Sequence, residues 1–224
     1  HRKPVRRVRS ASHEKPHEKN VSGVSMPLHC RRWLALAAML LSQAAGASVP
    51  CTAASGPQRV ALLELYTSQG CDSCPPTDNW LSALPARGFT TSRILALAFH
   101  VDYWDYLGWK DPYAQARFSE RQRLASARNQ ARFVYTPQLL LNGRDYRRGL
   151  PRDDLAEKVA AIGRDQPRAT ITLRQAPITD DMLAVSAKFA LDGGAESGRA
   201  QAYLALYENN LATPVAAGEN RGKK

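Results

Sequence analysis

This chain of 224 residues has no long apolar segment, and its composition does not match that of several protein classes. No apolar run reaches the ~18 residues that a helix needs to cross a bilayer, so we expect no membrane span. Four cysteines are too few for a disulfide-dense scaffold, and the composition does not indicate collagen, a coiled coil or bulk disorder. With 44% hydrophobic and 23% charged residues, the chain has enough apolar material for a globular core.

The basic residues are not spread evenly along the chain, although the formal net charge is +11. Residues 1–47 carry nine Lys and Arg against two Glu, so +7 of that charge lies near the start of the chain. Arg221, Lys223 and Lys224 hold another +3, and the remainder is nearly balanced. A basic stripe that would bind phosphates is therefore poorly supported, and we expect no nucleic-acid partner.

The N-terminal region has the pattern of an export signal. After Met26 come Arg31 and Arg32, then nine apolar residues, then the small residues 45–47. A charged segment, a short apolar segment and an A-x-A cleavage site in this order are typical of a secretory signal. The pattern predicts a disordered upstream extension at 1–25, a signal peptide at 26–47 and a secreted or periplasmic location.

In the rest of the chain, short apolar segments alternate with segments of helical spacing. The apolar segments predict strands, and they lie at 59–66, 93–101 and 137–141. Helices are expected after the first strand, over about 113–133, and from Pro151 onward. Because helices separate the strands, the order predicts parallel pairing, and the Asn142-Gly143 turn adds an antiparallel edge strand at 145–148.

The hydrophobic pattern of the sequence changes after Pro167. Three alternating segments, at 169–174, 183–191 and 199–207, predict an antiparallel β-meander. The sequence thus predicts an α/β domain followed by a β-rich extension.

A CxxC motif, Cys71-Asp72-Ser73-Cys74, lies where the first predicted strand is followed by the first predicted helix. At such a junction, backbone N–H groups and the positive end of the helix dipole stabilise a thiolate. We expect Cys71 to be the exposed attacking thiol and Cys74 the more buried resolving thiol. Asp72 or Ser73 is expected to cap the helix, and the charge of Asp72 opposes the dipole.

A second element, Thr136-Pro137, begins the third predicted strand. In thioredoxin-like folds, a cis proline after a small or β-branched residue lies opposite the CxxC motif. The segment 135–143 resembles that element, including the hairpin behind it. The resemblance implies a thioredoxin-like sheet flanked by helices, with a cis Thr136–Pro137 bond that faces Cys71 and presents the Thr136 backbone to a substrate peptide.

Longer motifs resemble one particular family, and they are Leu65–Pro76, Phe99–Pro112 and Val134–Gln138. They are similar to those of the secreted thioredoxin-like family catalogued as domain of unknown function 1223 (DUF1223), over about residues 60–219. The resemblance implies a thioredoxin-like domain at 48–166. It also implies a β-rich extension at 167–224 that stops short of the family's usual end.

Three functional hypotheses follow. The first is a secreted or periplasmic thiol–disulfide oxidoreductase in which Cys71 and Cys74 form the redox pair and Thr136-Pro137 holds the substrate. It needs no cofactor beyond the thiols, and its partners are protein or peptide thiols and a redox partner protein. The second is a copper- or zinc-binding module or metallochaperone with Cys71, Cys74 and His100 as ligands. The third is a non-catalytic thioredoxin-like binding domain with a structural disulfide.

For several other residues the sequence is compatible with two roles. Aromatic side chains in the second motif either line a substrate groove or cover the sheet edge; the groove candidates are Tyr103, Trp104, Tyr106 and Trp109. His100 is either a metal ligand or a strand-end residue packed against the loop. Glu64 is either a buried acid behind the resolving cysteine or an edge glutamate. Cys51 is either free or paired between molecules.

The export pattern makes one direct prediction. N-terminal sequencing of the exported protein is expected to begin just after Ala47, because the cleavage site follows the small residues at the end of the apolar segment. An exported form that begins at or before Met26 contradicts the signal peptide.

Overall fold

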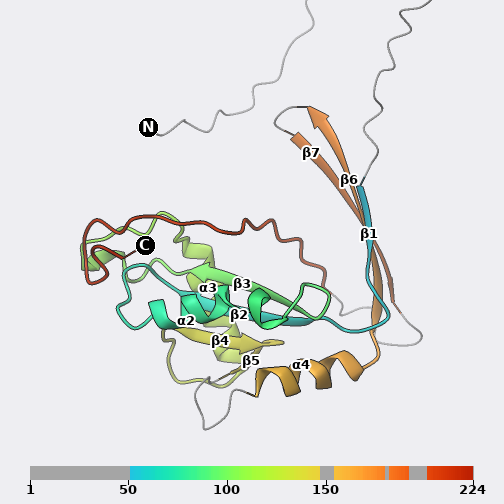
Figure 1. Cartoon of the computed structure of the whole chain (residues 1–224), viewed down its shortest axis with the longest axis horizontal. Helices are drawn as coiled ribbons and strands as arrows, with labels where there is room; N and C mark the ends of the chain where they lie inside the picture. The colour runs from blue at the N-terminus through green and yellow to red at the C-terminus, as the bar shows by residue number, and fades with distance from the viewer. Residues whose placement is uncertain (1–50, 147–153, 180–181, 192–200, 224) are drawn as a thin grey trace, which may run out of the picture. The chain divides into compact units, whose positions relative to one another are not determined.

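A computed structural model describes residues 51–146, 154–179, 182–191 and 201–223 (Figure 1). These residues form a mixed α/β fold with two sheets and three α-helices. The predicted upstream extension and signal peptide lie outside the described residues. No helix within the described part of the chain is long and apolar enough to span a membrane.

The first sheet contains four strands, and they are β2 (Ala61–Thr67), β3 (Ile94–His100), β4 (Gln138–Leu141) and β5 (Arg144–Asp145). Their order is β3-β2-β4-β5, with β2 parallel to β3, β2 antiparallel to β4, and β4 antiparallel to β5 (Figure 1). The parallel pairing predicted for the three helix-separated strands is confirmed for β2 and β3 but is wrong for β4, which runs antiparallel to β2. The antiparallel edge strand β5 is confirmed. Residues 147–148 of the predicted edge strand lie outside the described residues.

The register brings three chain segments to one edge of this sheet. Thr67 at the end of β2 pairs with His100 at the end of β3. Tyr66 pairs with Gln138 at the beginning of β4. The residues that follow β2 and β3 and those that precede β4 are therefore neighbours, although long stretches of sequence separate them.

The hairpin between β4 and β5 is the predicted one. Asn142 and Gly143 have φ values of 48° and 76°, the left-handed conformations that a two-residue hairpin turn requires. Asn142 is also bonded to the neighbouring strand, because its Oδ1 accepts a hydrogen bond from the Leu62 N–H at 2.8 Å. The turn thus fixes the register of β4 against β2.

The described residues also form three α-helices, which are α2 (Pro75–Ser82), α3 (Ala116–Arg128) and α4 (Leu155–Arg164). Two short 3-10 helices are η1 (Pro85–Arg87) and η2 (Asp105–Leu107). The second predicted helix, expected over about 113–133, begins later and ends earlier as α3. The N–H of Tyr113 donates to Asp111 at 2.9 Å instead of entering a helix. At the other end Gln130 has a positive φ of 54°, which stops the helical geometry.

The core lies on both faces of the four-stranded sheet. On one face Leu63 and Leu65 pack in a buried cluster with side chains from α2 and α4. On the other face Tyr66 and Leu140 are buried, with Ala125 of α3 packed against them. Because successive residues of a strand point to opposite faces, the apolar run of β2 supplies both clusters.

β2 also buries a carboxylate. Glu64 is 3% exposed, and Arg121 of α3 donates to its Oε1 from Nε at 2.8 Å and from Nη2 at 2.7 Å. This pairing satisfies a charge that would be unfavourable if buried alone. The expectation of an edge glutamate is wrong, because β2 lies between β3 and β4.

The second sheet has the order β1-β6-β7, with all neighbours antiparallel, and it consists of β1 (Cys51–Ala54), β6 (Ala169–Thr179) and β7 (Met182–Leu191). β6 and β7 confirm the first two strands of the predicted meander. The third, at 199–207, is wrong where it can be checked, because residues 201–207 form no strand. The third strand of this sheet is instead β1, which pairs with the opposite edge of β6. Its short segment carries no alternating pattern that would have predicted a strand.

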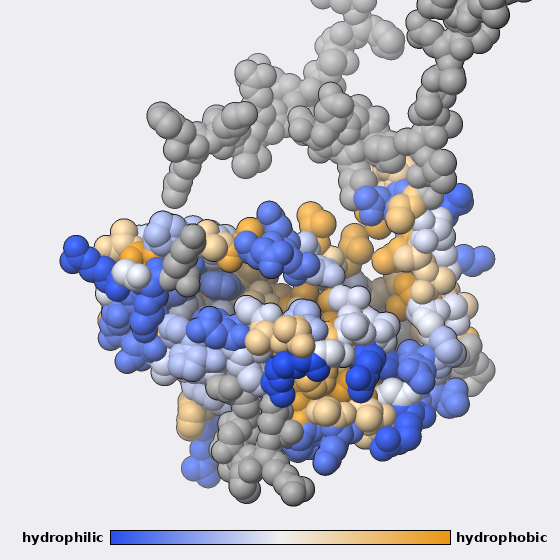
Figure 2. Space-filling model, in the orientation of Figure 1, coloured by the Kyte–Doolittle hydropathy of each residue, from blue (hydrophilic) through white to orange (hydrophobic). Residues whose placement is uncertain are grey.

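One face of the second sheet is apolar and partly open to solvent. Ile171 and Leu173 of β6 share this face with Phe189 of β7, since Ile171 pairs with Phe189. All three are at least a third exposed. In Figure 2 apolar residues are interspersed with hydrophilic ones on the visible face of the molecule.

A pair of leucine substitutions tests the position of the core. Leu63→Ala should lower the free energy of unfolding by about 2–5 kcal/mol, because Leu63 is fully buried and its loss leaves a cavity. Leu124→Ala on α3 is the matched control; Leu124 is 55% exposed, so the change should stay within about 0.5 kcal/mol. Urea unfolding measures both, and equal effects would contradict this core.

Candidate functional site: a disulfide at the helix start

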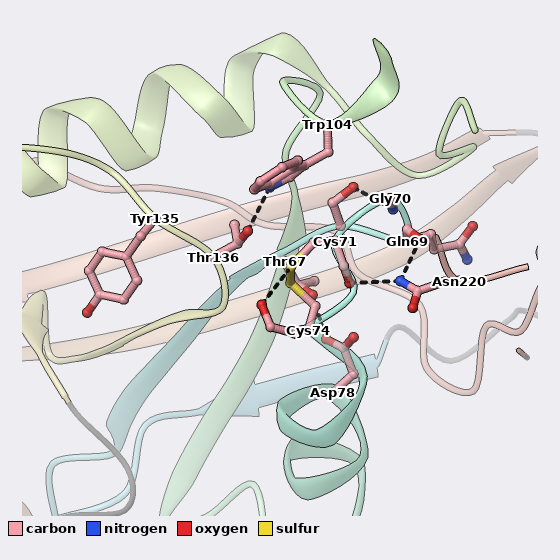
Figure 3. The surroundings of a disulfide bond; sticks show 12 residues. Thr67, Gln69, Gly70, Cys71, Cys74, Asp78, Trp104, Tyr135, Thr136 and Asn220 are labelled. Carbon is pink, nitrogen blue, oxygen red and sulfur yellow. Dashed lines mark hydrogen bonds between the residues drawn. A yellow bond between two sulfur atoms is a disulfide. The ribbon is translucent and has the colours of Figure 1, made fainter. Parts of the chain in front are cut away.

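Cys71 and Cys74 are joined by a disulfide, with their Cα atoms 5.5 Å apart. The chain leaves β2 at Thr67 and turns at once, since the Cys71 N–H donates to the Ser68 carbonyl at 3.2 Å. Ser68 Oγ accepts from the Gly70 N–H at 3.0 Å and tightens the same turn. The disulfide therefore lies between the end of β2 and the beginning of α2, as the sequence predicts (Figure 3).

The surroundings of the two sulfurs differ from the expectation in two ways. Cys71 is 2% exposed and Cys74 is 0% exposed, so the predicted exposure of Cys71 is wrong for the disulfide state described. The cap of α2 is Cys74 itself, and neither Asp72 nor Ser73 makes a side-chain cap.

The helix start also offers fewer donors to a thiolate than expected. The first two residues of α2 are prolines, which have no N–H. The next two N–H groups, of Thr77 and Asp78, donate to the Cys74 carbonyl at 2.9 and 3.1 Å. The hydroxyl of Ser73, whose Oγ lies 3.4 Å from Cys71 Sγ, is a donor within reach of the first sulfur.

Trp104 connects the CxxC loop to the Thr136-Pro137 segment. Its Nε1 donates to Thr136 Oγ1 at 2.7 Å (Figure 3). On the other side it packs on Gly70, where an added Cβ would lie 3.1 Å from both Trp104 Cβ and Trp104 O. The Thr136–Pro137 bond is cis, so this prediction is confirmed. Trp104 thus contacts both elements that the sequence predicts to face each other, through its indole at Thr136 and through its Cβ and backbone at Gly70.

Asp111 is a buried carboxylate that fixes the loop before the disulfide. It is 2% exposed, and its Oδ2 accepts from the Gln69 N–H at 2.8 Å and lies 2.7 Å from His100 Nδ1. Burial raises the pKa of Asp111. The hydrogen bond and charge of His100 and the N–H groups of Gln69 and Tyr113 outweigh burial, and its pKa is below the usual value.

His100 lies beside Asp111, and its ring meets that of Tyr113 edge-on at 5.4 Å. The structure therefore places it at the same sheet edge as the CxxC loop, with its Nδ1 engaged by a carboxylate. The described residues contain no group of three His, Cys, Asp or Glu side chains arranged to hold a metal. Metal binding by Cys71, Cys74 and His100 stays a prediction.

The four groove candidates make different contacts. Trp109 Nε1 donates to Gln69 Oε1 at 3.0 Å, and Tyr103 donates its hydroxyl to Gln122 Oε1 at 3.0 Å. Tyr106 stacks on Trp104 at 6.5 Å between ring centroids and is 77% exposed. Several of these rings are thus fixed in place around the loop, and their role as a substrate groove stays a prediction.

Asn220 is a site residue that the sequence analysis missed. It is 2% exposed, and its Nδ2 donates to the Cys71 carbonyl at 2.7 Å and the Gln69 carbonyl at 2.9 Å (Figure 3). Its Oδ1 accepts from Lys223 Nζ at 2.8 Å. No local sequence signal links residues 149 positions apart, so the pattern could not have predicted this contact.

Close packing holds the segment around Asn220 against the aromatic loop. Gly218 has a φ of +73°, and a Cβ there would lie 3.0 Å from Trp109 Cβ and 3.3 Å from the Leu107 carbonyl. Within the segment, the Val215 N–H donates to the Lys223 carbonyl at 3.0 Å. The glycine therefore allows a close approach that any larger residue would block.

Asp78 of α2 is the second missed residue. Thr67 Oγ1 donates to its Oδ1 at 2.7 Å. Burial raises the pKa of Asp78, the Thr67 bond and the charge of His100 partly offset this, and its pKa is above the usual value. The signal was present in the sequence, because Asp78 is four residues after Cys74 in the predicted helix, a spacing that places both on one helix face.

The family model described as "Protein of unknown function (DUF1223)" matches residues 62–224, so the chain belongs to this family. A crystal structure of a protein from Agrobacterium tumefaciens is similar at 33% sequence identity, with a TM-score of 0.42. The match covers 53% of this chain and 58% of that one. No curated protein matches the chain.

Replacing Asn220 tests the contact between the C-terminal segment and the CxxC loop. Asn220→Ala should lower the free energy of unfolding of the oxidised protein by about 1–3 kcal/mol, because the Gln69 and Cys71 carbonyls lose a buried donor. Denaturant unfolding followed by tryptophan fluorescence measures the change.

The matched control is Asn79→Ala, the same substitution at an exposed position of α2. It should change the free energy of unfolding by less than about 0.5 kcal/mol. If the two variants are equally stable, Asn220 does not hold the loop.

Proposed function

We propose that this protein is a thiol–disulfide oxidoreductase with a thioredoxin-like arrangement, in which Cys71 and Cys74 form the redox pair. The observation that carries the proposal is the disulfide at the start of α2, linked through Trp104 to Thr136. The strand order β3-β2-β4-β5 also supports it, because this order brings the CxxC loop and the segment before β4 to one edge.

The chemistry is an exchange of two electrons between thiols and disulfides. In the reduced protein, the Cys71 thiolate attacks a substrate disulfide, forms a mixed disulfide and releases the first substrate thiolate. Cys74 then attacks the Cys71 sulfur, which releases the second substrate thiolate and leaves the Cys71–Cys74 disulfide. The reverse sequence oxidises a substrate dithiol, and no metal or organic cofactor takes part.

Access to the sulfur requires a movement. Because Cys71 is 2% exposed, a substrate can reach its sulfur only after a neighbouring group shifts. Trp104 is the nearest candidate, since it packs on Gly70 and is bonded to Thr136. We propose that the substrate backbone replaces this contact at Thr136, with Tyr103, Tyr106 and Trp109 around it.

The proposed location is secreted or periplasmic, because disulfide exchange between proteins persists in oxidising compartments. The partners are then protein or peptide thiols and a second protein that restores the redox state of the pair.

A structural disulfide in a binding domain is the second candidate. The burial of both cysteines favours it, since inert structural disulfides are usually shielded from solvent thiols. The two candidates differ in one property, which is whether a thiol or disulfide in solution can exchange with Cys71 in the folded protein.

Trapping of mixed disulfides tests the proposal. In a Cys30→Ser/Cys51→Ser background, which leaves the CxxC pair as the remaining cysteines of the chain, Cys74→Ser should accumulate a covalent adduct with a peptide disulfide. Without the resolving thiol, the attacked complex has no exit. Cys71→Ser should form at least 10-fold less adduct, because the attacking sulfur is missing. Intact-protein mass spectrometry measures both.

The Cys30→Ser/Cys51→Ser protein with its CxxC motif intact is the control and should form the internal disulfide instead of an adduct. Equal trapping by both variants would reverse or remove the assigned roles. Absence of any adduct in both would favour the structural disulfide.

A further inference from the structure

Asp78 lies beside the redox pair, yet the exchange steps above give it no role. It is a partly buried carboxylate on α2, in the first turns after the disulfide (Figure 3). Thr67 Oγ1, at the end of β2, donates to its Oδ1 at 2.7 Å. Among the described residues this is the hydrogen bond that the side chain accepts, so Oδ2 remains available for another donor.

The geometry of α2 places Asp78 next to Cys74. Cys74 already has helical backbone angles, with φ −76° and ψ −40°, and its carbonyl accepts from the Asp78 N–H at 3.1 Å. Side chains four residues apart on a helix lie on one face with Cβ atoms about 5–6 Å apart. The two side chains therefore start one helical turn apart on the same face of α2.

Two buried carboxylates near this sheet edge, Glu64 and Asp111, are already engaged. Glu64 receives two bonds from Arg121. Asp111 accepts from Gln69 and Tyr113 and pairs with His100. The charged groups that act on Asp78 from the neighbouring elements are His100 at the end of β3 and Asp111 in the loop before α3.

Cys74 needs a base to react. It is 0% exposed, so bulk water and solvent bases cannot take its proton directly. Only the thiolate attacks a disulfide, and an apolar environment disfavours that form. A carboxylate whose pKa is raised by burial is a better proton acceptor at neutral pH than an ordinary one.

We propose that Asp78 is the proton acceptor for Cys74 in the resolving step of thiol–disulfide exchange, with Thr67 as its positioning residue. The inference rests on the proposed function and adds a residue to it. The Cys74 thiol gives its proton to the Asp78 carboxylate, and the resulting thiolate attacks the Cys71 sulfur of the mixed disulfide. The Cys71–Cys74 bond forms, the bond to the substrate breaks, and the substrate leaves as a thiolate.

Electrons and protons balance in both directions of the exchange. The substrate disulfide is the oxidant and takes up two electrons, and the cysteine pair loses them. Asp78 then returns its proton to the departing thiolate or to solvent. When the protein instead oxidises a dithiol, Cys74 is the leaving group and Asp78 protonates it.

A single-turnover experiment tests this role. Reduced Cys30→Ser/Cys51→Ser protein is mixed with excess oxidised glutathione at a series of pH values and quenched with acid. Mass spectrometry then separates the glutathione adduct from the internal disulfide. Asp78→Asn should form the adduct but resolve it about 100-fold more slowly at pH 7. Its rate should recover toward the alkaline range, where a free cysteine ionises near pH 8.5 without help.

The pH profile separates a proton acceptor from a merely structural residue. In the wild-type sequence the resolving rate should fall as pH decreases through the pKa of Asp78, because the protonated carboxyl cannot accept a proton. Thr67→Val keeps the shape of the side chain and removes the donor. Since the Thr67 bond lowers the pKa of Asp78, this variant should shift the profile to higher pH. Asp165→Asn, on an exposed carboxylate, is the matched control and should leave the profile unchanged.

Failure of the inference and failure of the proposed function look different. If Asp78→Asn forms the adduct and resolves it with the unchanged rate and pH profile, Asp78 is not the acceptor but the oxidoreductase stands. If no adduct forms even with Cys74→Ser, the proposed function fails and the role of Asp78 falls with it. If Asp78→Asn does not fold, an unchanged Thr67→Val profile contradicts the assignment.

Discussion

The pairing of β2 along both of its edges is the constraint on which the site depends. Its register with β3 places Thr67 beside His100, and its register with β4 places Tyr66 beside Gln138. A shift of one residue would turn the apolar side chains of β2 from one face to the other and would move the segment before β4 away from the CxxC loop. The buried side chains on both faces therefore fix the register of β2, and this register determines which segments meet at the site.

Three side chains from distant segments then fix the loop that carries Cys71. Asp111 accepts the Gln69 N–H, Asn220 donates to the Gln69 and Cys71 carbonyls, and Trp104 packs on Gly70. Each satisfies or covers a backbone group that would otherwise be unpaired at a sheet edge. The loop is thus held by contacts from three segments while both cysteines are buried, and we propose that exchange with a substrate requires some of these contacts to open.

Local patterns predict much of this molecule because local physics determines those parts. The apolar run of β2, the Asn142-Gly143 turn and the two prolines after Cys74 each specify a strand, a hairpin or a helix start within a few residues. The disulfide and the cis Thr136–Pro137 bond were predicted from motifs. Contacts between distant segments have no such signal, which is why Asn220 and β1 were missed, and the burial of Cys71 follows from tertiary packing.

The measurement that tests the central claim most directly is a redox titration of the folded protein against glutathione or dithiothreitol buffers, with metal analysis of the reduced form. The account predicts a reversible two-electron couple for Cys71 and Cys74, with a potential above the ~−300 mV below which structural disulfides resist the glutathione pool. A disulfide that is reduced only when the protein unfolds, or a reduced form that retains copper or zinc, would contradict it.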